Sequence, residues 1–361
     1  MTGWASTFSR VLRCRSLLFL LATGAAIGHG AAASEIATAA SSPRQLGTVE
    51  VLSGPQACKT GECYDIQVTC PDVAAPAHAR LKVGAPAGPA KGTILFVSGG
   101  LGTGWYESDE PGRRILADVS AAGFRTVQLQ WIDSWLLASP GKEEGHVRLG
   151  CRAATVARWV YNRVHDQPAL PFCATGHSGG AAQVSYMLSH YGLDQVLAAV
   201  VPTGGPPMGR MDRSCAPDDP AAATIAFPEW ATRLIDAGFG FVPPGDPHRF
   251  NPFEAPALGP CARGDVSFRE KLRQASVASG EGKYVYPKTM VWFVFEGTDD
   301  THAAAMGTTY FDLLVKEGSP LVRRTVIPGV THAGPTGLYS SAKGVETIRE
   351  ILLSECRIRT P

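Results

Sequence analysis

The apolar and polar positions divide the chain into a strand-rich beginning and a longer part in which strands alternate with helices. Short strands separated by Gly and Pro are expected at 47–53, 64–69 and 78–83. From residue 91 onward apolar runs alternate with amphipathic stretches, which predicts a largely parallel sheet. The run at 93–97 is almost continuously apolar, as expected for a strand that helices cover on both faces.

The same alternation continues to the end of the chain, with one long interruption. Further strands are expected at 124–131, 172–175, 195–201, 289–295 and 324–327, and helices at 111–122, 149–164, 179–191 and 341–353. Residues 204–285 break the rhythm, since they are rich in Pro, Gly and Asp and hold no repeated strand–helix unit. We therefore expect this stretch to be an insertion that forms a cap over a site.

Residues 1–33 have the pattern of a signal peptide. Arginines precede an apolar run at 16–27, and an Ala-Ala-Ala sequence then offers a cleavage site. A membrane anchor is the alternative, but the run is short and has no stop-transfer flank. We expect a secreted or periplasmic protein without a stable membrane anchor, with a flexible leader at 34–46 and a folded domain at 47–361.

The cysteine count agrees with an exported protein. Of nine cysteines, those that remain after signal-peptide removal are Cys58, Cys63, Cys70, Cys151, Cys173, Cys215, Cys261 and Cys356. An even number in an exported chain favours disulfides, and local pairs such as Cys58–Cys63 and Cys215–Cys261 are guesses at their connectivity. A zinc site at the first three cysteines is the alternative, but the spacing lacks a C-x2-C pair and a nearby pair of histidines.

Charge and glycine patterns exclude two other classes. The chain has 33 Lys and Arg against 32 Asp and Glu, so it lacks the basic character of a nucleic-acid-binding protein. The Gly-rich turn at 99–104 has neither G-x-G-x-x-G spacing nor the Lys of a phosphate-binding loop. We expect no nucleic acid, no metal and no cofactor.

The most informative motif is Gly176-His177-Ser178-Gly179-Gly180, which follows an apolar run and precedes a helical stretch. Glycines on both sides of a serine permit the strained turn that projects its hydroxyl from the end of a strand. The pentapeptide also arises by chance in a Gly-rich chain, so the strand before it and the helix after it support the interpretation. His177 is expected to be a packed neighbour of this turn.

A serine nucleophile needs a base and a carboxylate that orients the base, and both follow later strands. The segment Glu296–Asp300 comes after the strand at 289–295, and His332 comes after the next strand. The order along the chain is therefore serine, acid, histidine. Asp299 and Asp300 could instead cap a following helix.

With these motifs the chain resembles the α/β-hydrolase superfamily, over about residues 91–203 and 287–355. The resemblance implies an α/β fold with a mostly parallel central sheet, helices on both faces and a cap-like insertion. It also implies Ser178 as nucleophile, His332 as base and Asp300 as orienting acid. Family members tend to place the acid three residues after the glycine that ends this strand, which favours Asp300 over Asp299.

The resemblance further implies an oxyanion hole made of backbone N–H groups. One donor would be Gly179, and the other would come from Gly100 or Leu101, with Gly100 narrowly favoured. Many relatives carry His-Gly in this turn, where the present chain has Ser98-Gly99. The side-chain difference leaves the backbone donor in place.

Four aromatic residues are candidates for a substrate pocket. Trp105, Tyr106 and Trp135 follow strand ends, where sheets of this kind bind ligands, and Trp230 lies in the insertion. Each could equally be a core residue.

Together these features predict an exported serine hydrolase that cleaves a small-molecule or polymeric carboxylic ester through an acyl-enzyme on Ser178. A serine peptidase or amidase, or an acyltransferase, could use the same triad. An alternative from another class is a non-catalytic binding protein on a hydrolase scaffold. Neither the substrate nor the oligomeric state follows from the sequence.

Overall fold

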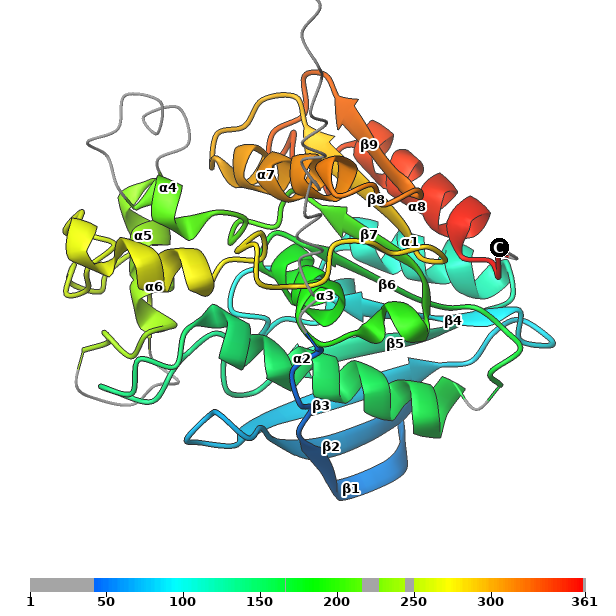
Figure 1. Cartoon of the computed structure of the whole chain (residues 1–361). Helices are drawn as coiled ribbons and strands as arrows, with labels where there is room; N and C mark the ends of the chain where they lie inside the picture. Colours follow the sequence, from blue (N-terminus) through cyan, green and yellow to red (C-terminus); the bar gives the residue numbers. More distant parts are fainter. Residues whose placement is uncertain (1–41, 166, 216–226, 244–249, 360–361) are drawn as a thin grey trace, which may run out of the picture. The chain divides into compact units, whose positions relative to one another are not determined.

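The alternating apolar runs form a nine-stranded sheet with helices on both faces (Figure 1). The computed structural model describes residues 42–165, 167–215, 227–243 and 250–359. The expected signal peptide at 1–33 lies outside the described residues, as does the leader up to residue 41.

The sheet is antiparallel at one edge and parallel elsewhere. Its strands are β1 (Thr48–Cys58), β2 (Gly61–Thr69), β3 (Ala77–Gly84), β4 (Gly92–Val97), β5 (Phe124–Trp131), β6 (Phe172–His177), β7 (Leu197–Thr203), β8 (Met290–Glu296) and β9 (Val322–Ile327). Their order is β1-β2-β3-β5-β4-β6-β7-β8-β9. Pairing is antiparallel from β1 to β5 and parallel from there to β9. Strand β4 is buried at every position, as its uninterrupted apolar run predicts.

Helices with apolar faces cover the sheet on both sides. They are α1 (Glu110–Ala121), α2 (His146–Val160), α3 (Gly179–Ser189), α7 (Ala303–Lys316) and α8 (Ala342–Glu355). Helices α1 and α8 share one buried apolar cluster with the sheet, and α2, α3 and α7 share the other. The stretch between β7 and β8 carries the shorter helices α4 (Met211–Ser214), α5 (Glu229–Ala237) and α6 (Arg269–Gln274).

Helix α7 was not predicted from the sequence. Its buried residues Met306, Tyr310 and Leu314 do recur at helical spacing. However, Gly307 and the two threonines that follow it have low helix propensity, which weakens the local signal. Tertiary packing explains the glycine, since a Cβ on Gly307 would lie 2.6 Å from the carbonyl oxygen of Gly205.

Four disulfides join the eight cysteines of the described residues. Cys58–Cys63 and Cys215–Cys261 are the two local pairs that were expected, and the structure confirms both. The other two bonds, Cys70–Cys151 and Cys173–Cys356, span 81 and 183 residues. They connect β2 to α2 and β6 to the end of α8, so both long bonds tie the sheet to a covering helix.

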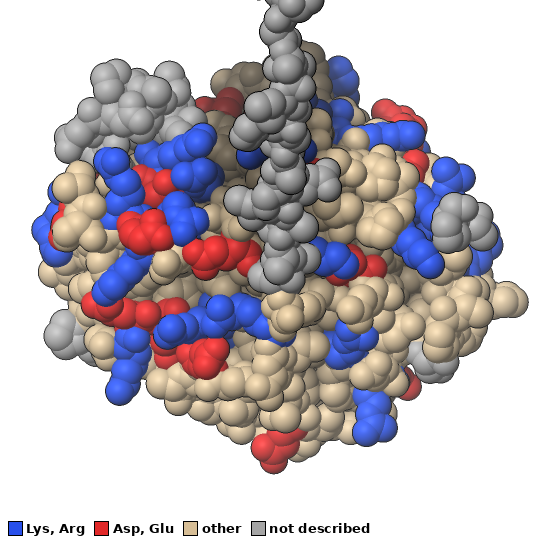
Figure 2. Space-filling view, viewed as in Figure 1, with Lys and Arg blue, Asp and Glu red and all other residues tan. Residues whose placement is uncertain are grey.

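The surface shown in Figure 2 carries charges of both signs, interspersed over the side on which α4, α5 and α6 lie. Several of them pair, for example Lys271 with Glu143 and Arg273 with Glu270. Among the described residues, no helix is both long and apolar enough to cross a membrane. The same residues contain no group of His, Cys, Asp and Glu side chains that could hold a metal ion.

Candidate active site

Ser178 lies on a strained turn between a strand and a helix. Strand β6 ends at His177 and helix α3 begins at Gly179, and Ser178 between them has φ 54° and ψ −115°. A positive φ at a non-glycine residue costs of order 1–3 kcal/mol and persists only where the surroundings enforce it. A Cβ on Gly176 would lie 2.5 Å from the backbone of Gly180, so the tight turn requires glycine there. The sequence predicted this strand–turn–helix arrangement.

The histidine expected as the base contacts a different carboxylate from the expected one. His332 lies after β9, and its Nδ1 is 2.7 Å from Oε1 of Glu296, the last residue of β8. The Glu296 side chain is fully buried, and its other oxygen, Oε2, has no hydrogen-bond partner among the described residues. A buried carboxylate that contacts a single ring is placed to orient that ring and to stabilise its charged form.

Asp300, which was expected to contact the His332 ring, accepts a hydrogen bond from the backbone N–H of His332 at 3.0 Å. The expected pairing of Asp300 with the ring is therefore corrected: Asp300 is exposed and fixes the loop, and Glu296 reaches the ring. Asp299 accepts a hydrogen bond from the backbone N–H of Ala305 at 2.7 Å, in the first turn of α7. Asp299 thus has the helix-capping position that was the alternative for this pair.

The ring of His177 stacks on the ring of His332, with centroids 4.6 Å apart and an interplanar angle of 29°. Burial, and next the positive charge that His332 can carry, hold the pKa of His177 well below its usual value. His177 is therefore a neutral, buried neighbour of His332, packed at the elbow. Behind it, the hydroxyl of Tyr106 donates to the hydroxyl of Tyr339 at 2.6 Å, and the Tyr339 ring packs against His177. Tyr106, a candidate pocket residue, lies in this buried layer.

The turn after β4 brings a second backbone segment against the elbow. A Cβ on Gly179 would lie 2.3 Å from the carbonyl oxygen of Gly100, so the two backbones touch. Gly100 and Gly179 line the same cavity as Ser178, whereas Leu101 is not among the residues that line it. Gly179 and Gly100 thus lie beside Ser178, and of the two choices for the second donor Gly100 lines the cavity.

Trp135 supports this turn from behind and does not line the cavity. Its indole Nε1 donates to the carbonyl oxygen of Gly100 at 3.1 Å, and its backbone N–H donates to the carbonyl oxygen of Leu101 at 3.3 Å. The side chain is completely buried. The expectation that Trp135 belongs to the substrate pocket is therefore corrected, because its ring is occupied in holding the Gly100 turn.

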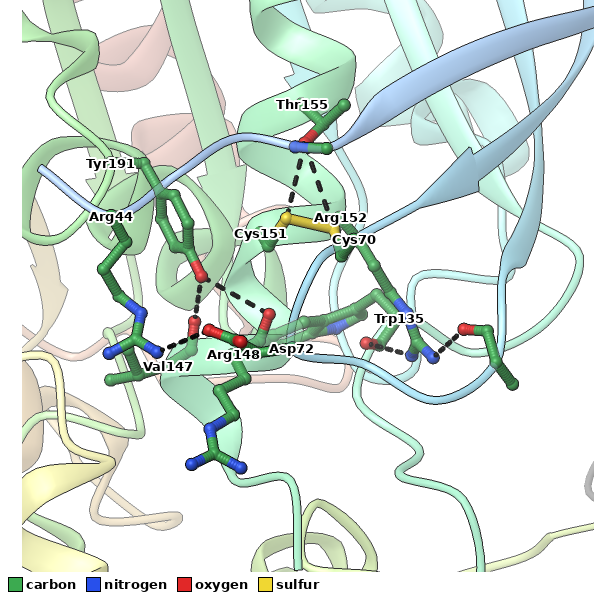
Figure 3. Close-up of a disulfide and its surroundings, with 12 residues drawn as sticks. Arg44, Cys70, Asp72, Trp135, Val147, Arg148, Cys151, Arg152, Thr155 and Tyr191 are labelled. Atoms are coloured by element: carbon green, nitrogen blue, oxygen red, sulfur yellow. Dashed lines mark hydrogen bonds and ion pairs between the residues drawn. A yellow bond between two sulfur atoms is a disulfide. The ribbon is translucent and has the colours of Figure 1, made fainter. Parts of the chain in front are cut away.

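A buried arginine holds Trp135 in turn (Figure 3). Arg152 of α2 follows Cys151, which forms the disulfide with Cys70. The Arg152 guanidinium donates to the carbonyl oxygen of Trp135 at 2.9 Å and to that of Leu137 at 3.0 Å. Burial lowers the pKa of Arg152 to about 10. The disulfide, Arg152, Trp135 and the Gly100 turn form a continuous chain of contacts from β2 to the elbow.

Ser178 and His332 share one cavity of about 110 Å³. Its other lining residues are mainly apolar and come from several elements: Gly100, Leu136, Gly179, Pro207, Met208, Phe227, Trp230, Ala231, Leu234, Ile235, Thr301 and Ala303. Of the four aromatic candidates, Trp230 lines this cavity. Trp105 does not, and its ring lies instead beneath the Nζ of Lys82, 4.8 Å from the ring centroid.

No protein-family model matches the chain, and no curated protein matches its sequence. Solved structures do match. An acylaminoacyl peptidase from Pyrococcus horikoshii superposes with a TM-score of 0.50 at 11% identity, over 84% of this chain and 43% of that chain. A thermostable carboxyl esterase from Bacillus coagulans gives a TM-score of 0.49 at 12% identity, over 81% and 97% of the two chains. Est1E from Butyrivibrio proteoclasticus gives a TM-score of 0.46 at 10% identity, over 81% and 98%.

The chain has the α/β-hydrolase fold. This confirms the fold class expected from the sequence, with its mostly parallel sheet and helices on both faces. The chain spans less than half of the length of the peptidase. The fold is common to esterases, lipases and peptidases, so the reaction must be argued from the site.

In this α/β-hydrolase fold, the stretch between β7 and β8 contributes one wall of the cavity. Helix α5 supplies Trp230, Ala231, Leu234 and Ile235 to the lining. The end of α5 is joined to the following loop because Asp236 accepts hydrogen bonds from the backbone N–H groups of Cys261 and Ala262, at 2.8 and 2.9 Å. From the stretch 204–285, helix α5 with Pro207, Met208 and Phe227 therefore lies beside Ser178.

Proposed function

We propose that this protein is an exported serine hydrolase that cleaves carboxylic esters through an acyl-enzyme on Ser178. The observation that carries the proposal is the arrangement of three groups. Ser178, on a strained elbow, shares an apolar cavity with His332, and the ring of His332 contacts the buried carboxylate of Glu296 at 2.7 Å.

In the proposed reaction, His332 takes the proton of Ser178 while the serine oxygen attacks the ester carbonyl carbon. The Glu296 carboxylate accepts the Nδ1–H of His332, which fixes the tautomer and stabilises the imidazolium. His332 then donates its proton to the departing alcohol, and a water molecule activated by the same histidine releases the acid. We assign the role of orienting acid to Glu296, and to Asp300 the task of positioning the backbone of His332.

The tetrahedral intermediate carries a negative charge on the former carbonyl oxygen. The backbone N–H of Gly179, at the start of α3, and an N–H of the Gly100 turn are the proposed donors to this oxygen. The positive end of the α3 helix dipole adds to the stabilisation.

The cavity favours an apolar acyl group. Its described lining contains no Lys, Arg, Asp or Glu, and its volume of about 110 Å³ compares with the roughly 150 Å³ of an apolar cavity that holds one benzene molecule. A charged acyl group would lose its hydration there without gaining a partner. We therefore propose esters whose acyl group is uncharged and about the size of one ring or a short alkyl chain.

The four disulfides support export. Such bonds form and persist in oxidising compartments and are rare in the cytosol. We propose that the mature protein begins after residue 33 and is secreted or periplasmic.

Labelling with a fluorophosphonate tests the nucleophile. The wild-type protein from Ser34 onward is expected to label covalently. Ser178→Ala and His332→Ala are each expected to label at least about 100-fold more slowly, because removing a triad residue causes losses of this order or larger in other serine hydrolases. Ser53→Ala, at a serine on β1, is the matched control and should label like the wild type. A folded wild type that stays unlabelled would favour the non-catalytic alternative.

Trp135→Phe tests the support of the oxyanion turn. The substitution keeps a buried ring but removes the hydrogen bond from Nε1 to Gly100, worth about 1 kcal/mol. We expect kcat to fall about fivefold, with KM little changed, because the turn is less well positioned for the transition state. Trp159→Phe, at a ring that packs against Tyr64, is the control and should leave kcat unchanged. Equal effects of the two variants would contradict the proposed support.

A further inference from the structure

An aromatic pair extends the cavity wall toward solvent. The ring of Trp230, which lines the cavity beside Ser178, stacks on the ring of Phe253 with centroids 5.3 Å apart and an interplanar angle of 30°. Phe253 is 67% exposed, more than the other large exposed apolar residues of the described chain. An exposed phenylalanine that contacts a pocket residue is therefore a feature of this surface that the proposed chemistry does not explain.

Hydrogen bonds hold the backbone of the loop that carries Phe253. Arg233 of α5 donates to the carbonyl oxygens of Pro252 and Phe253, at 3.0 and 3.2 Å. The side chain of Asn251 accepts a hydrogen bond from the backbone N–H of Phe253 at 3.1 Å. The two Arg233 bonds join the loop to the same helix that carries Trp230.

Apolar and aromatic side chains follow one another from the cavity beside Ser178 to Phe253. The cavity wall on α5 is apolar, and Trp230 and Phe253 continue it with aromatic faces and edges. Aromatic groups gain stabilisation from offset or edge-to-face contact with such rings beyond what area burial alone gives. An alkyl chain gains only the free energy of burying its apolar surface area.

We propose that Trp230 and Phe253 form an aryl-binding subsite, and that the preferred substrates are esters of arylalkanoic acids. In such an ester the chain between carbonyl and ring would occupy the cavity next to Ser178, and the ring would pack against the aromatic pair. This inference rests on the proposed function and names the substrate class of that same site.

The test compares acyl groups on one leaving group. With p-nitrophenyl acetate and p-nitrophenyl 3-phenylpropanoate, we expect Phe253→Ala to lower kcat/KM for the phenylpropanoate about three- to tenfold, and Trp230→Ala to lower it further. Phe253→Ala, at a residue outside the cavity lining, should change kcat/KM for the acetate less than twofold. Leu258→Ala, at a 41% exposed residue of the same segment that does not line the cavity, is the matched control and should change neither.

Equal losses on both esters would overturn the proposal, because the pair would then act on the leaving group or on the fold. Phe253→Leu separates these cases, since it keeps an apolar side chain and removes only the ring. It should reproduce the loss on the phenylpropanoate that Phe253→Ala causes. If Phe253→Leu instead restores wild-type rates, the surface is merely apolar and does not select an aryl group.

Inactivation by two phosphonates separates failure of the subsite from failure of the proposed function. A 2-phenylethyl phosphonate, in which phosphorus takes the place of the carbonyl carbon of the phenylpropanoate, is expected to react with the wild type several-fold faster than a methyl phosphonate, and Phe253→Ala should remove that preference. If the wild type reacts with both equally, the subsite is wrong and the nucleophile stands. If the folded wild type reacts with neither and hydrolyses neither ester, the proposed function fails, and the subsite with it.

Discussion

Glu296→Gln is expected to lower kcat about 10,000-fold, the loss seen when a triad carboxylate is replaced by its amide. The amide nitrogen can present a donor to Nδ1 of His332, which favours the wrong tautomer of the ring. The amide also removes the negative charge that stabilises the imidazolium. The substitution keeps the volume of a fully buried side chain, so the fold should be retained. Single-turnover kinetics on a p-nitrophenyl ester would measure the loss.

Asp300→Asn is the matched control for this substitution. It replaces the other carboxylate that contacts His332, but at the backbone N–H and at an exposed position. The amide oxygen can still accept that hydrogen bond, so we expect kcat to fall less than tenfold. A larger loss in Asp300→Asn than in Glu296→Gln would return the role of acid to Asp300.

Lowering the pH from 7.5 to 5.5 is expected to reduce the free energy of unfolding by at least about 2 kcal/mol. Burial lowers the pKa of His146 and His190 to about 3 and holds that of His177 well below its usual value. In the unfolded chain His146 and His190 bind protons below about pH 6.5, whereas in the folded protein they do not. Together these two histidines cost the folded state about 3 kcal/mol of stability over this interval, and His177 acts in the same direction.

One carboxyl group acts in the opposite direction. Burial raises the pKa of Asp236 to about 6, so the folded state takes up a proton from pH 7.5 to 5.5 that the unfolded state does not. This offsets about 1 kcal/mol of the loss. Urea unfolding at several pH values would measure the net slope.

His146→Leu tests the source of this acid sensitivity. The ring of His146 is completely buried, packs edge-on against Phe239, and lies so close to Gly238 that a Cβ there would be 2.2 Å from it. Leucine of similar volume cannot titrate, so the loss between pH 7.5 and 5.5 should shrink by about 1 kcal/mol. An unchanged slope would mean that this histidine titrates in the folded protein as it does in the unfolded chain.

The sheet and its helices could be predicted because local pattern and global position agree. The run at 93–97, for example, is apolar on both faces, and β4 is buried at every position. Helix α7 shows the limit of this approach. Its glycine is required by close contact with Gly205, a tertiary constraint that weakens the local pattern.

The nucleophile turn was predictable because its constraints are local. A serine between glycines, after a strand and before a helix, has few other uses. The carboxylate that contacts the His332 ring was not predictable, because that contact depends on which side chain reaches the ring from another loop. Glu296 ends a buried apolar strand, and a charged residue in that position is itself a signal that a partner exists nearby. The spacing typical of the family favours Asp300 instead of Glu296.

Substrate-pocket residues were the least predictable part. Trp105, Tyr106 and Trp135 all follow strand ends, yet each ring contacts other parts of the protein. The ring of Trp105 lies beneath Lys82, Tyr106 contacts Tyr339, and Trp135 contacts the Gly100 turn. Position at the end of a strand places a side chain near the site. It does not determine whether that side chain faces the ligand or supports the loop.

With the proposed export, the Cys173–Cys356 bond gives the chain an order of maturation. A chain exported from its N-terminus would present Cys173 long before Cys356, which lies 183 residues later at the end of α8. During that interval Cys173 is a free thiol in the strand that leads to Ser178, and Cys215 or Cys261 can capture it. Production of this protein should therefore depend on a disulfide isomerase more strongly than on oxidant alone, and the correct bond at β6 would close last.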